Sequence, residues 1–444
     1  MSESTPQNAG KQDQAVIEDM IPWPKSIEET ELSLSFLADL ALKFIYYSSD
    51  MTSTAIAREL ALPFRGVMEK VLDFLKREEY VEISGAKGFG ERGYQWLISG
   101  KGVERALQAL ERDQYIGPAP VPFERYCEMV LKQSVGDMTV GPADVRSALS
   151  HLVVSPELVN KIGPAVNSGR SFFLYGPPGN GKTVVAKSIV RMLRGYVYIP
   201  YTVIVDGQII RLYDELNHKL WEEPVEEAAN ESANRVGARR IDTRWIKISR
   251  PEIVVGGELT MRNLDLIYDP ISKTYEAPLQ MKANTGLFVI DDFGRQAMRP
   301  QDLLNRWIVP LELRLDFLTL QTGKKIEVPF DQLLVFSTNL DPRDLVDEAF
   351  LRRIRHKLMI GNPDEKQYYQ IMQKECAAHR LELSRDAFVH LMQRHYIDEG
   401  RTMRCCHPRD LIDQIRDIST FLGIQPVLSN EMIDAACEGY FADL

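Results

Sequence analysis

The stretch GPPGNGKT at residues 176–183 decides the fold class of this chain. It fits the phosphate-loop pattern G-x-x-x-x-G-K-[ST], follows an apolar stretch at 171–175 and runs into a helical pattern at 183–193. In this context glycines let backbone N–H groups turn towards a phosphate, and the N-terminus of the following helix adds its dipole. The residues predicted to bind ATP are Gly176, Pro177, Pro178, Gly179, Asn180, Gly181, Lys182 and Thr183.

Two acidic residues follow another apolar stretch, LFVI at 287–290. We expect Lys182 to contact the β- and γ-phosphates, and Thr183 and Asp291 to hold Mg²⁺, Asp291 through its water shell. Asp292 is the candidate base that orients and deprotonates the attacking water. Two adjacent acids can also form a solvated turn, so this interpretation depends on the phosphate loop upstream.

The pattern around these motifs predicts an α/β fold with a parallel sheet. The stretches at 171–175, 287–290 and 333–337 are almost continuously apolar, which is typical of strands covered on both faces. We assign residues 141–361 to this large ATPase domain. Residues 362–444 contain four helical stretches and are predicted to form a helical lid domain.

The N-terminal part is predicted to contain a separate domain. Residues 1–30 are polar and aperiodic and are expected to form a flexible arm. Helical patterns at 32–47, 52–62 and 63–79 precede two candidate strands at 80–83 and 94–98, the arrangement of a winged helix, which we place at 31–115. The stretch GPAPVPF then indicates a proline-rich linker over 116–140.

Composition restricts where the protein works and what it binds. The net charge of −10 argues against broad adhesion to nucleic acid, because such adhesion depends on Lys and Arg. Five cysteines in 444 residues form no disulfide framework, and no apolar run is long enough to span a membrane. We therefore expect a cytoplasmic protein with no membrane insertion.

These motifs resemble the AAA+ ATPases over about residues 140–444, and the resemblance implies further site residues. Asn339, after the strand at 333–338, matches sensor 1, a polar side chain that in this family helps to place the attacking water. Arg352 is the first candidate and Arg353 the second for an arginine finger that completes a neighbouring subunit's site. The segment around Arg409 resembles sensor 2, where an arginine at the start of a lid helix contacts the γ-phosphate. The resemblance thus implies Mg²⁺-dependent ATP hydrolysis in a homo-oligomeric ring, usually a hexamer.

The sequence departs from the family in two places. The usual Asp-Glu pair is Asp291-Asp292 here, whose second side chain is one methylene shorter. More than ninety residues separate the phosphate-loop helix from Asp291, which indicates an insertion. Its end and the pair of stretches at 317–320 and 325–328 resemble family members with a hairpin insert that faces the ring pore.

Two alternatives concern other ligands. Cys405, Cys406 and His407 are an unfavourable zinc motif, because adjacent thiolates do not easily converge on one ion.

In the N-terminal domain the third helical pattern has four basic and four acidic residues, and residues 31–115 carry eleven basic against thirteen acidic ones. This balance favours a protein client and a chaperone-like remodelling function over DNA binding by a regulator or initiator, which remains the alternative.

Overall fold

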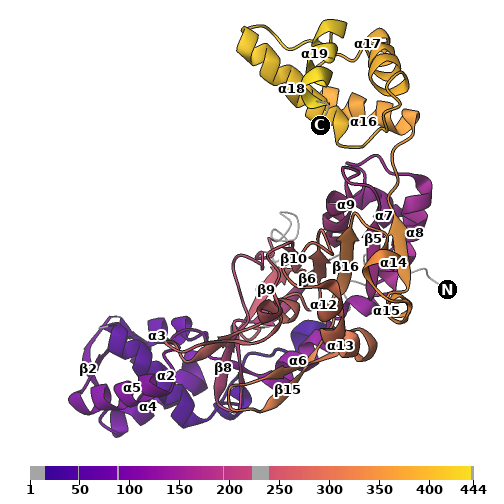
Figure 1. Ribbon diagram of the computed structural model, residues 1–444. Coiled ribbons are helices and arrows are strands. Elements are labelled where there is room, and N and C mark those ends of the chain that lie inside the picture. Colours follow the sequence, from indigo (N-terminus) through magenta and orange to yellow (C-terminus); the bar gives the residue numbers. More distant parts are fainter. Residues whose placement is uncertain (1–15, 49, 88–89, 194, 223–239, 442–444) are drawn as a thin grey trace, which may run out of the picture.

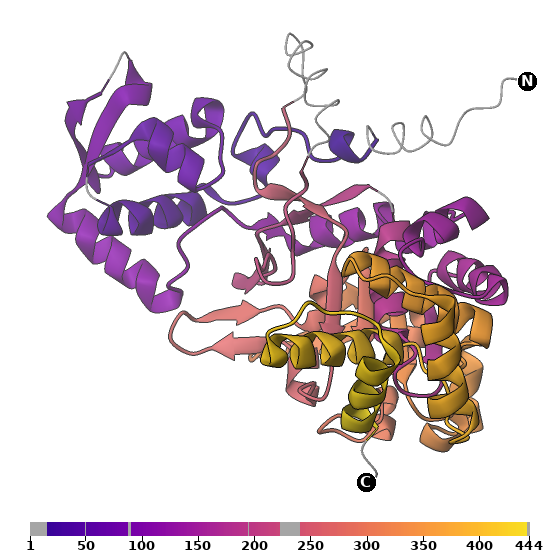
Figure 2. The same cartoon turned by 90° about the horizontal axis from the view of Figure 1, so that it is seen from above.

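The computed structural model describes residues 16–48, 50–87, 90–193, 195–222 and 240–441. Figure 1 shows an elongated arrangement, with the N-terminal helices at one end, the sheets in the middle and the C-terminal helices at the other end. The view from above in Figure 2 shows the N-terminal helices again set apart from the other parts. None of the described helices has the length and apolar character needed to cross a membrane.

A five-stranded parallel sheet forms the centre of the ATPase part. Its strand order is β10-β13-β16-β5-β17. The strands are β5 (Ser171–Tyr175), β10 (Glu252–Val255), β13 (Leu287–Ile290), β16 (Leu333–Thr338) and β17 (His356–Met359). The α/β prediction is confirmed, and the three apolar stretches of the sequence are the three central strands.

Both faces of this sheet are covered, which explains why its strands are apolar throughout. In β5, Phe172 and Leu174 belong to one core cluster and Phe173 belongs to the other, as the two-residue period of a strand requires. The first cluster includes residues of α7 (Pro142–Ala148), α8 (Pro156–Asn167) and α9 (Lys182–Ser188). The second includes residues of α12 (Pro300–Arg306), α13 (Ile308–Leu313) and α15 (Glu348–Arg353).

A second, mixed sheet of order β11-β12-β8-β7-β4 consists of four strands of the insertion and of β4, which precedes the phosphate loop. Two antiparallel pairs, β6 with β9 and β14 with β15, accompany it. Residues 223–239 of the insertion lie outside the described residues. The elements are β4 (Val121–Pro122), β6 (Tyr196–Pro200), β7 (Thr202–Val205), β8 (Gln208–Arg211), β9 (Trp245–Ser249), β11 (Ile267–Asp269), β12 (Thr274–Glu276), β14 (Leu315–Thr319) and β15 (Lys325–Pro329).

The N-terminal domain contains three helices and a three-stranded sheet of order β1-β3-β2, followed by a helix that the sequence pattern did not reveal. That helix, α5, packs against α2. Assignment to the winged-helix class stays a prediction. The elements are α2 (Leu34–Tyr47), β1 (Met51–Thr52), α3 (Ser53–Glu59), α4 (Glu69–Arg77), β2 (Val81–Ala86), β3 (Tyr94–Ile98) and α5 (Gly100–Arg112).

Two segments predicted to lack packed structure have it. In the predicted arm, residues 1–30, Ile21 is buried with Tyr198 and Trp245 of the insertion, and Ile27 lies in the core of the N-terminal domain. The predicted linker, 116–140, contains α6 (Phe123–Lys132), whose Tyr126 lies in the core of the second sheet. The sequence pattern missed both because their apolar residues pack against strands distant in sequence.

The described part of the lid, residues 362–441, is helical. It has its own core cluster of apolar residues. A π-helical turn, η7 (Gln393–Ile397), continues directly from the second helix. The other helices are α16 (Glu365–Ala378), α17 (Arg385–Met392), α18 (His407–Leu422) and α19 (Asn430–Tyr440).

Candidate nucleotide-binding site

The phosphate loop connects β5 to α9 and depends on glycine at its first position. Gly176 has a φ of +138°, and a Cβ atom added there would overlap the backbone carbonyl oxygen of Ile360. Gly181, with a φ of +79°, precedes the first residue of α9. The loop therefore takes a backbone path that side chains would obstruct, and it ends at a helix N-terminus, which favours an anion.

Lys182 lies inside the loop rather than in solvent. Its side chain is buried, and its Nζ donates to the carbonyl oxygens of Gly176 and Pro177, at 2.9 Å each. Burial lowers the pKa of Lys182, whereas the nearby carboxylates of Asp292 and Asp291 act in the opposite direction. The ammonium group is thus held at the mouth of the loop, where it can reach the phosphates of a nucleotide.

The sheet brings the predicted metal ligands together. The Thr183 hydroxyl donates to Oδ2 of Asp291 over 2.7 Å, although 108 positions separate the two residues. Asp291 directly follows β13, and Thr183 belongs to the helix that follows β5, with β16 between the two strands. Hydroxyl and carboxylate oxygens are hard donors, so this pair suits Mg²⁺.

Asp292 adopts an uncommon backbone conformation beside these ligands. Its φ is +48°, in the left-handed region that Asp tolerates better than most residues. Asn339, at the end of β16, donates from Nδ2 to Oδ1 of Asp292 over 3.0 Å. The left-handed backbone gives a physical reason for the shorter acid at this position, because Glu is less suited to that conformation.

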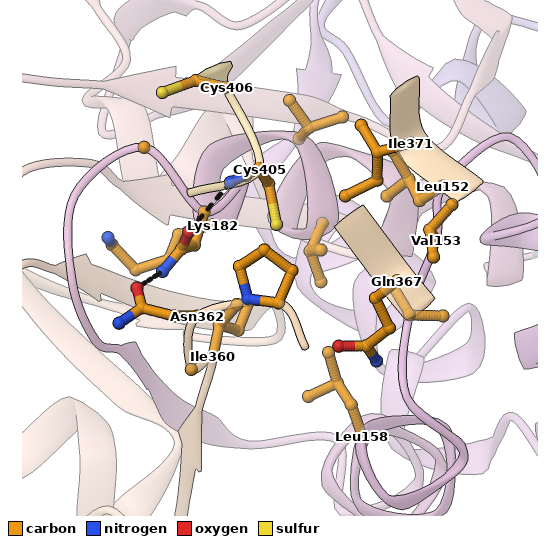
Figure 3. Close-up of a pocket in the computed structure, with 18 of the residues that line it drawn as sticks. Leu152, Val153, Leu158, Lys182, Ile360, Asn362, Gln367, Ile371, Cys405 and Cys406 are labelled. Atoms are coloured by element: carbon orange, nitrogen blue, oxygen red, sulfur yellow. Dashed lines mark hydrogen bonds between the residues drawn. The ribbon is translucent and has the colours of Figure 1, made fainter. Parts of the chain in front are cut away.

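The loop opens into a cleft of about 700 Å³ between the sheet and the lid. Figure 3 shows its side chains. One part is apolar, of a kind that suits the flat face of a nucleobase. Sequence analysis missed these residues; the apolar run LVV at 152–154, just before α8, was an available signal. The apolar lining includes Leu152, Val153, Leu158, Ile360 and Ile371.

The lid contacts the phosphate loop through backbone and amide groups. The N–H of Cys406 donates to the carbonyl oxygen of Gly179 over 2.8 Å, and the N–H of Cys405 donates to Oδ1 of Asn180 over 3.1 Å. The Asn180 side chain also donates to Oδ1 of Asn362 over 2.8 Å. Asn180 therefore links the loop to both ends of the segment that carries the first lid helices.

The predicted arginines divide into two groups. Arg409 lines the cleft from α18, with its guanidinium also paired to Asp410 at 2.9 Å. Arg352 and Arg353 are absent from the described lining of the cleft. Arg352 is 77% exposed and pairs with Glu348 of its own helix, while Arg353 pairs with Glu312 at 2.6 Å. The fold thus brings together the loop, both acids, Asn339 and Arg409, but not these two arginines.

Part of this chain is similar in sequence to known ATPases and nucleotidases. Over 121 residues the chain is 29% identical to the proteasome-activating nucleotidase of Thermococcus gammatolerans, covering 26% of this chain and 29% of that protein. Over 50 residues it is 46% identical to the vesicle-fusing ATPase of Dictyostelium discoideum, covering 11% of this chain and 6% of that protein. The chain therefore spans less than a third of these relatives.

Two further similarities concern the C-terminal helices and the chain as a whole. A family model described as a domain of unknown function (DUF8689) matches residues 364–439, which contain the lid helices. The solved structure of NtrX from Brucella abortus covers 75% of this chain and is itself covered to 66%, with 12% identity. The TM-score between the two structures is 0.40.

The sheet, the phosphate loop and the paired acids define a P-loop nucleotide-binding domain. Its curated relatives are AAA+ ATPases, and part of this chain is similar to them in sequence.

We predict that Lys182→Ala weakens ATP binding by about two orders of magnitude, because charged hydrogen bonds to two phosphates contribute roughly 3 kcal/mol together. Isothermal titration calorimetry with ATP and Mg²⁺ measures this. The control is Lys187→Ala, which removes an exposed lysine of the same helix and should leave affinity unchanged. Equal affinity of Lys182→Ala and the parent would contradict the assignment.

Proposed function

We propose that this chain hydrolyses ATP with Mg²⁺ as one subunit of a homo-oligomeric ring and uses the energy to remodel a protein client. The observation that carries the proposal is the convergence of Lys182, Thr183, Asp291 and Asp292 on one cleft from separate strands. In this reading ATP supplies the phosphoryl group, and Mg²⁺ supplies charge neutralisation beside Thr183 and Asp291.

Asp292 and Asn339 are proposed to handle the attacking water. The carboxylate accepts a proton from water, and Asn339, whose amide already contacts that carboxylate at 3.0 Å, holds both in place. Arg409 approaches the cleft from the lid and is suited to bind phosphate oxygens, because its charge is permanent. These roles use groups on both sides of the cleft, so turnover requires the lid to be seated.

We predict that Asp292→Asn retains nucleotide binding but lowers the hydrolysis rate by about 10² to 10⁴, the usual contribution of a general base. Asn tolerates the same left-handed backbone and keeps the shape of the side chain, so folding should be unaffected. Phosphate release at saturating ATP measures the rate. Asp344→Asn, at an exposed acid outside the described cleft lining, is the control.

Hydrolysis at the parental rate in Asp292→Asn would assign the base to another residue. Loss of nucleotide binding in the same variant would instead indicate that Asp292 acts in binding.

The position of Arg352 supports an active site shared between subunits. Its side chain projects into solvent from α15, paired over 3.1 Å with the equally exposed Glu348, and it does not line its own chain's described cleft. An exposed surface pair contributes little to stability, so Arg352 is easily released towards another partner. Arg353 is the second candidate, but its contact with Glu312 ties it more closely to its own subunit.

We predict that Arg352→Ala with Arg353→Ala lowers the hydrolysis rate by about 10³ to 10⁵ while each subunit still binds ATP. Mixing this double variant with Lys182→Ala should restore part of the activity, because some interfaces then pair an intact loop with an intact arginine. Arg416→Ala, at a lid arginine paired with Asp413, is the control. The ring mechanism fails if the co-assembled variants recover no activity.

A protein client is favoured by the surface of the N-terminal domain. Residues 63–79, which include helix α4, carry four basic and four acidic residues, and the β2–β3 pair exposes Ile83 by 36% and Leu97 by 45%. DNA binding requires clustered positive charge, whereas exposed apolar side chains suit a protein surface.

We predict no saturable binding of a labelled 20-base-pair duplex below about 10 µM protein at 150 mM salt, a concentration in the middle of the range of dissociation constants for non-specific association. Fluorescence anisotropy at 50 and 150 mM salt measures this. Submicromolar binding that is lost in Lys70→Glu with Lys76→Glu would favour the DNA-associated alternative instead.

A further inference from the structure

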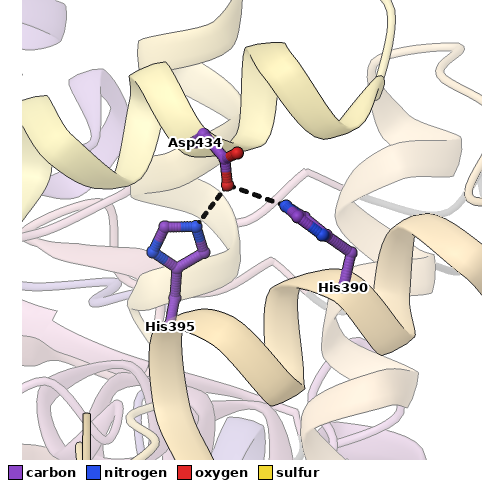
Figure 4. Close-up of side chains that lie close together, drawn as sticks. All are labelled: His390, His395 and Asp434. Atoms are coloured by element: carbon purple, nitrogen blue, oxygen red, sulfur yellow. Dashed lines mark hydrogen bonds and ion pairs between the residues drawn. The ribbon is translucent and has the colours of Figure 1, made fainter. Parts of the chain in front are cut away.

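Two histidines and one aspartate of the lid converge on a single point away from the nucleotide cleft. His390 lies in α17, His395 in η7 and Asp434 in α19. Both imidazoles contact Oδ1 of Asp434 through Nε2, at 2.7 Å for His390 and 2.6 Å for His395. Figure 4 shows the two rings pointing at the carboxylate from one side. None of the proposed steps of ATP hydrolysis uses these three residues.

A π-helical turn makes this convergence possible. Residues five positions apart on a regular α-helix point about 140° away from each other. Between Gln393 and Asp398, however, the chain forms an i to i+5 hydrogen bond of 2.9 Å. The wider turn brings His395 to the face that carries His390. Turns of this kind are rare, and those that occur are frequently found at functional sites. Here the turn interrupts a regular helix at the place where the two imidazoles meet the carboxylate.

The three side chains provide a ligand set for a metal ion. One atom from each lies within 4.8 Å of the others. Two imidazoles and a carboxylate suit borderline divalent ions, zinc above all, and leave a fourth position for water. The side chains are partly buried, His395 at 12% exposure and His390 and Asp434 at 21% each, so an ion could enter while its ligands stay ordered.

We propose that His390, His395 and Asp434 bind one zinc ion, which fastens the α17–η7 segment to α19 within the lid. This site is separate from the cysteine motif that the sequence argued against. Burial raises the pKa of the Cys405 thiol to about 11, which keeps it protonated and a poor ligand.

The charges around the site agree with a bound cation. Asp434 is contacted at Oδ1 by Nε2 of both His390 and His395. Arg394 pairs with the other oxygen, Oδ2, at 2.8 Å and leaves Oδ1 as the metal ligand. Glu431, exposed on the preceding turn of α19, interacts electrostatically with both Asp434 and His390 and offsets the arginine's charge.

Only small movements separate the described geometry from a zinc complex. Ligand atoms about 2.0 to 2.1 Å from a tetrahedral zinc ion lie about 3.3 Å from one another. The two nitrogen–oxygen distances must therefore each lengthen by roughly 0.6 Å, and rotation about side-chain bonds suffices for this. When the ion is bound, each neutral imidazole would present an unprotonated Nε2 to it and carry its ring proton on Nδ1.

Zinc titration of the full chain, stripped with chelator and free of nucleotide, tests the proposal. Competition with a chromophoric chelator gives stoichiometry and affinity. We expect one equivalent in the parent, and at least ten-fold weaker binding of that equivalent in His390→Gln with His395→Gln. Glutamine can still donate a hydrogen bond to Asp434, so the lid should fold. His379→Gln, in the same lid, is the matched control and should bind as the parent does.

Two further measurements separate this site from the nucleotide cleft. Zinc should raise the melting temperature of the parent and of Asp291→Asn, but not of the double histidine variant, because binding to the folded state alone stabilises it. The proposal is overturned if the parent binds no zinc below about 100 µM. It is equally overturned if the equivalent survives in the double variant, or disappears in Asp291→Asn. None of these three outcomes would contradict the proposed hydrolysis of ATP.

Discussion

The contact between Gly176 and Ile360 is the constraint on which the rest of the structure depends. The backbone N–H of Ile360 donates to the carbonyl oxygen of Tyr175 over 2.8 Å, extending the β17–β5 pairing into the phosphate loop. The chain can pass so close because residue 176 has no side chain. The segment leading to the lid is thereby fixed against the loop, and Asn362 follows with its contact to Asn180. Phosphate loop and lid attachment are thus one structural unit.

The sequence predicted the parts of this fold that local patterns determine. The apolar strands β5, β13 and β16 and the residues at their carboxyl ends follow from runs of apolar residues and from motifs in their expected context. The second sheet was not predicted. It combines β4, of two residues, and short pieces from 202 to 276 in a mixed order, so long-range pairing rather than periodicity defines it. Ile21 and Tyr126 were misassigned for the same reason.

Within the site, residue types were predictable but conformations were not. The motif in the sequence placed two acidic residues after β13, but the sequence pattern does not specify the left-handed backbone conformation of Asp292. That conformation rationalises Asp in place of the usual Glu. The apolar side of the cleft was missed because Leu152 and Ile371 come from segments over 200 residues apart, which approach only when the lid covers the sheet.

The lid's contacts indicate how the nucleotide site and the lid can affect each other. Burial, followed by nearby Arg404, lowers the pKa of His407 to about 4, so its imidazole is neutral at physiological pH. Its Nδ1 lies 2.9 Å from the hydroxyl of Tyr396, which also contacts the hydroxyl of Tyr368. Cys406, immediately before it, donates to Gly179. A shift of the phosphate loop when it binds phosphate would therefore be transmitted through Cys406 to His407, which is buried in the lid. Because that core is continuous through α16 to α19, the displacement moves the helices together instead of deforming one of them.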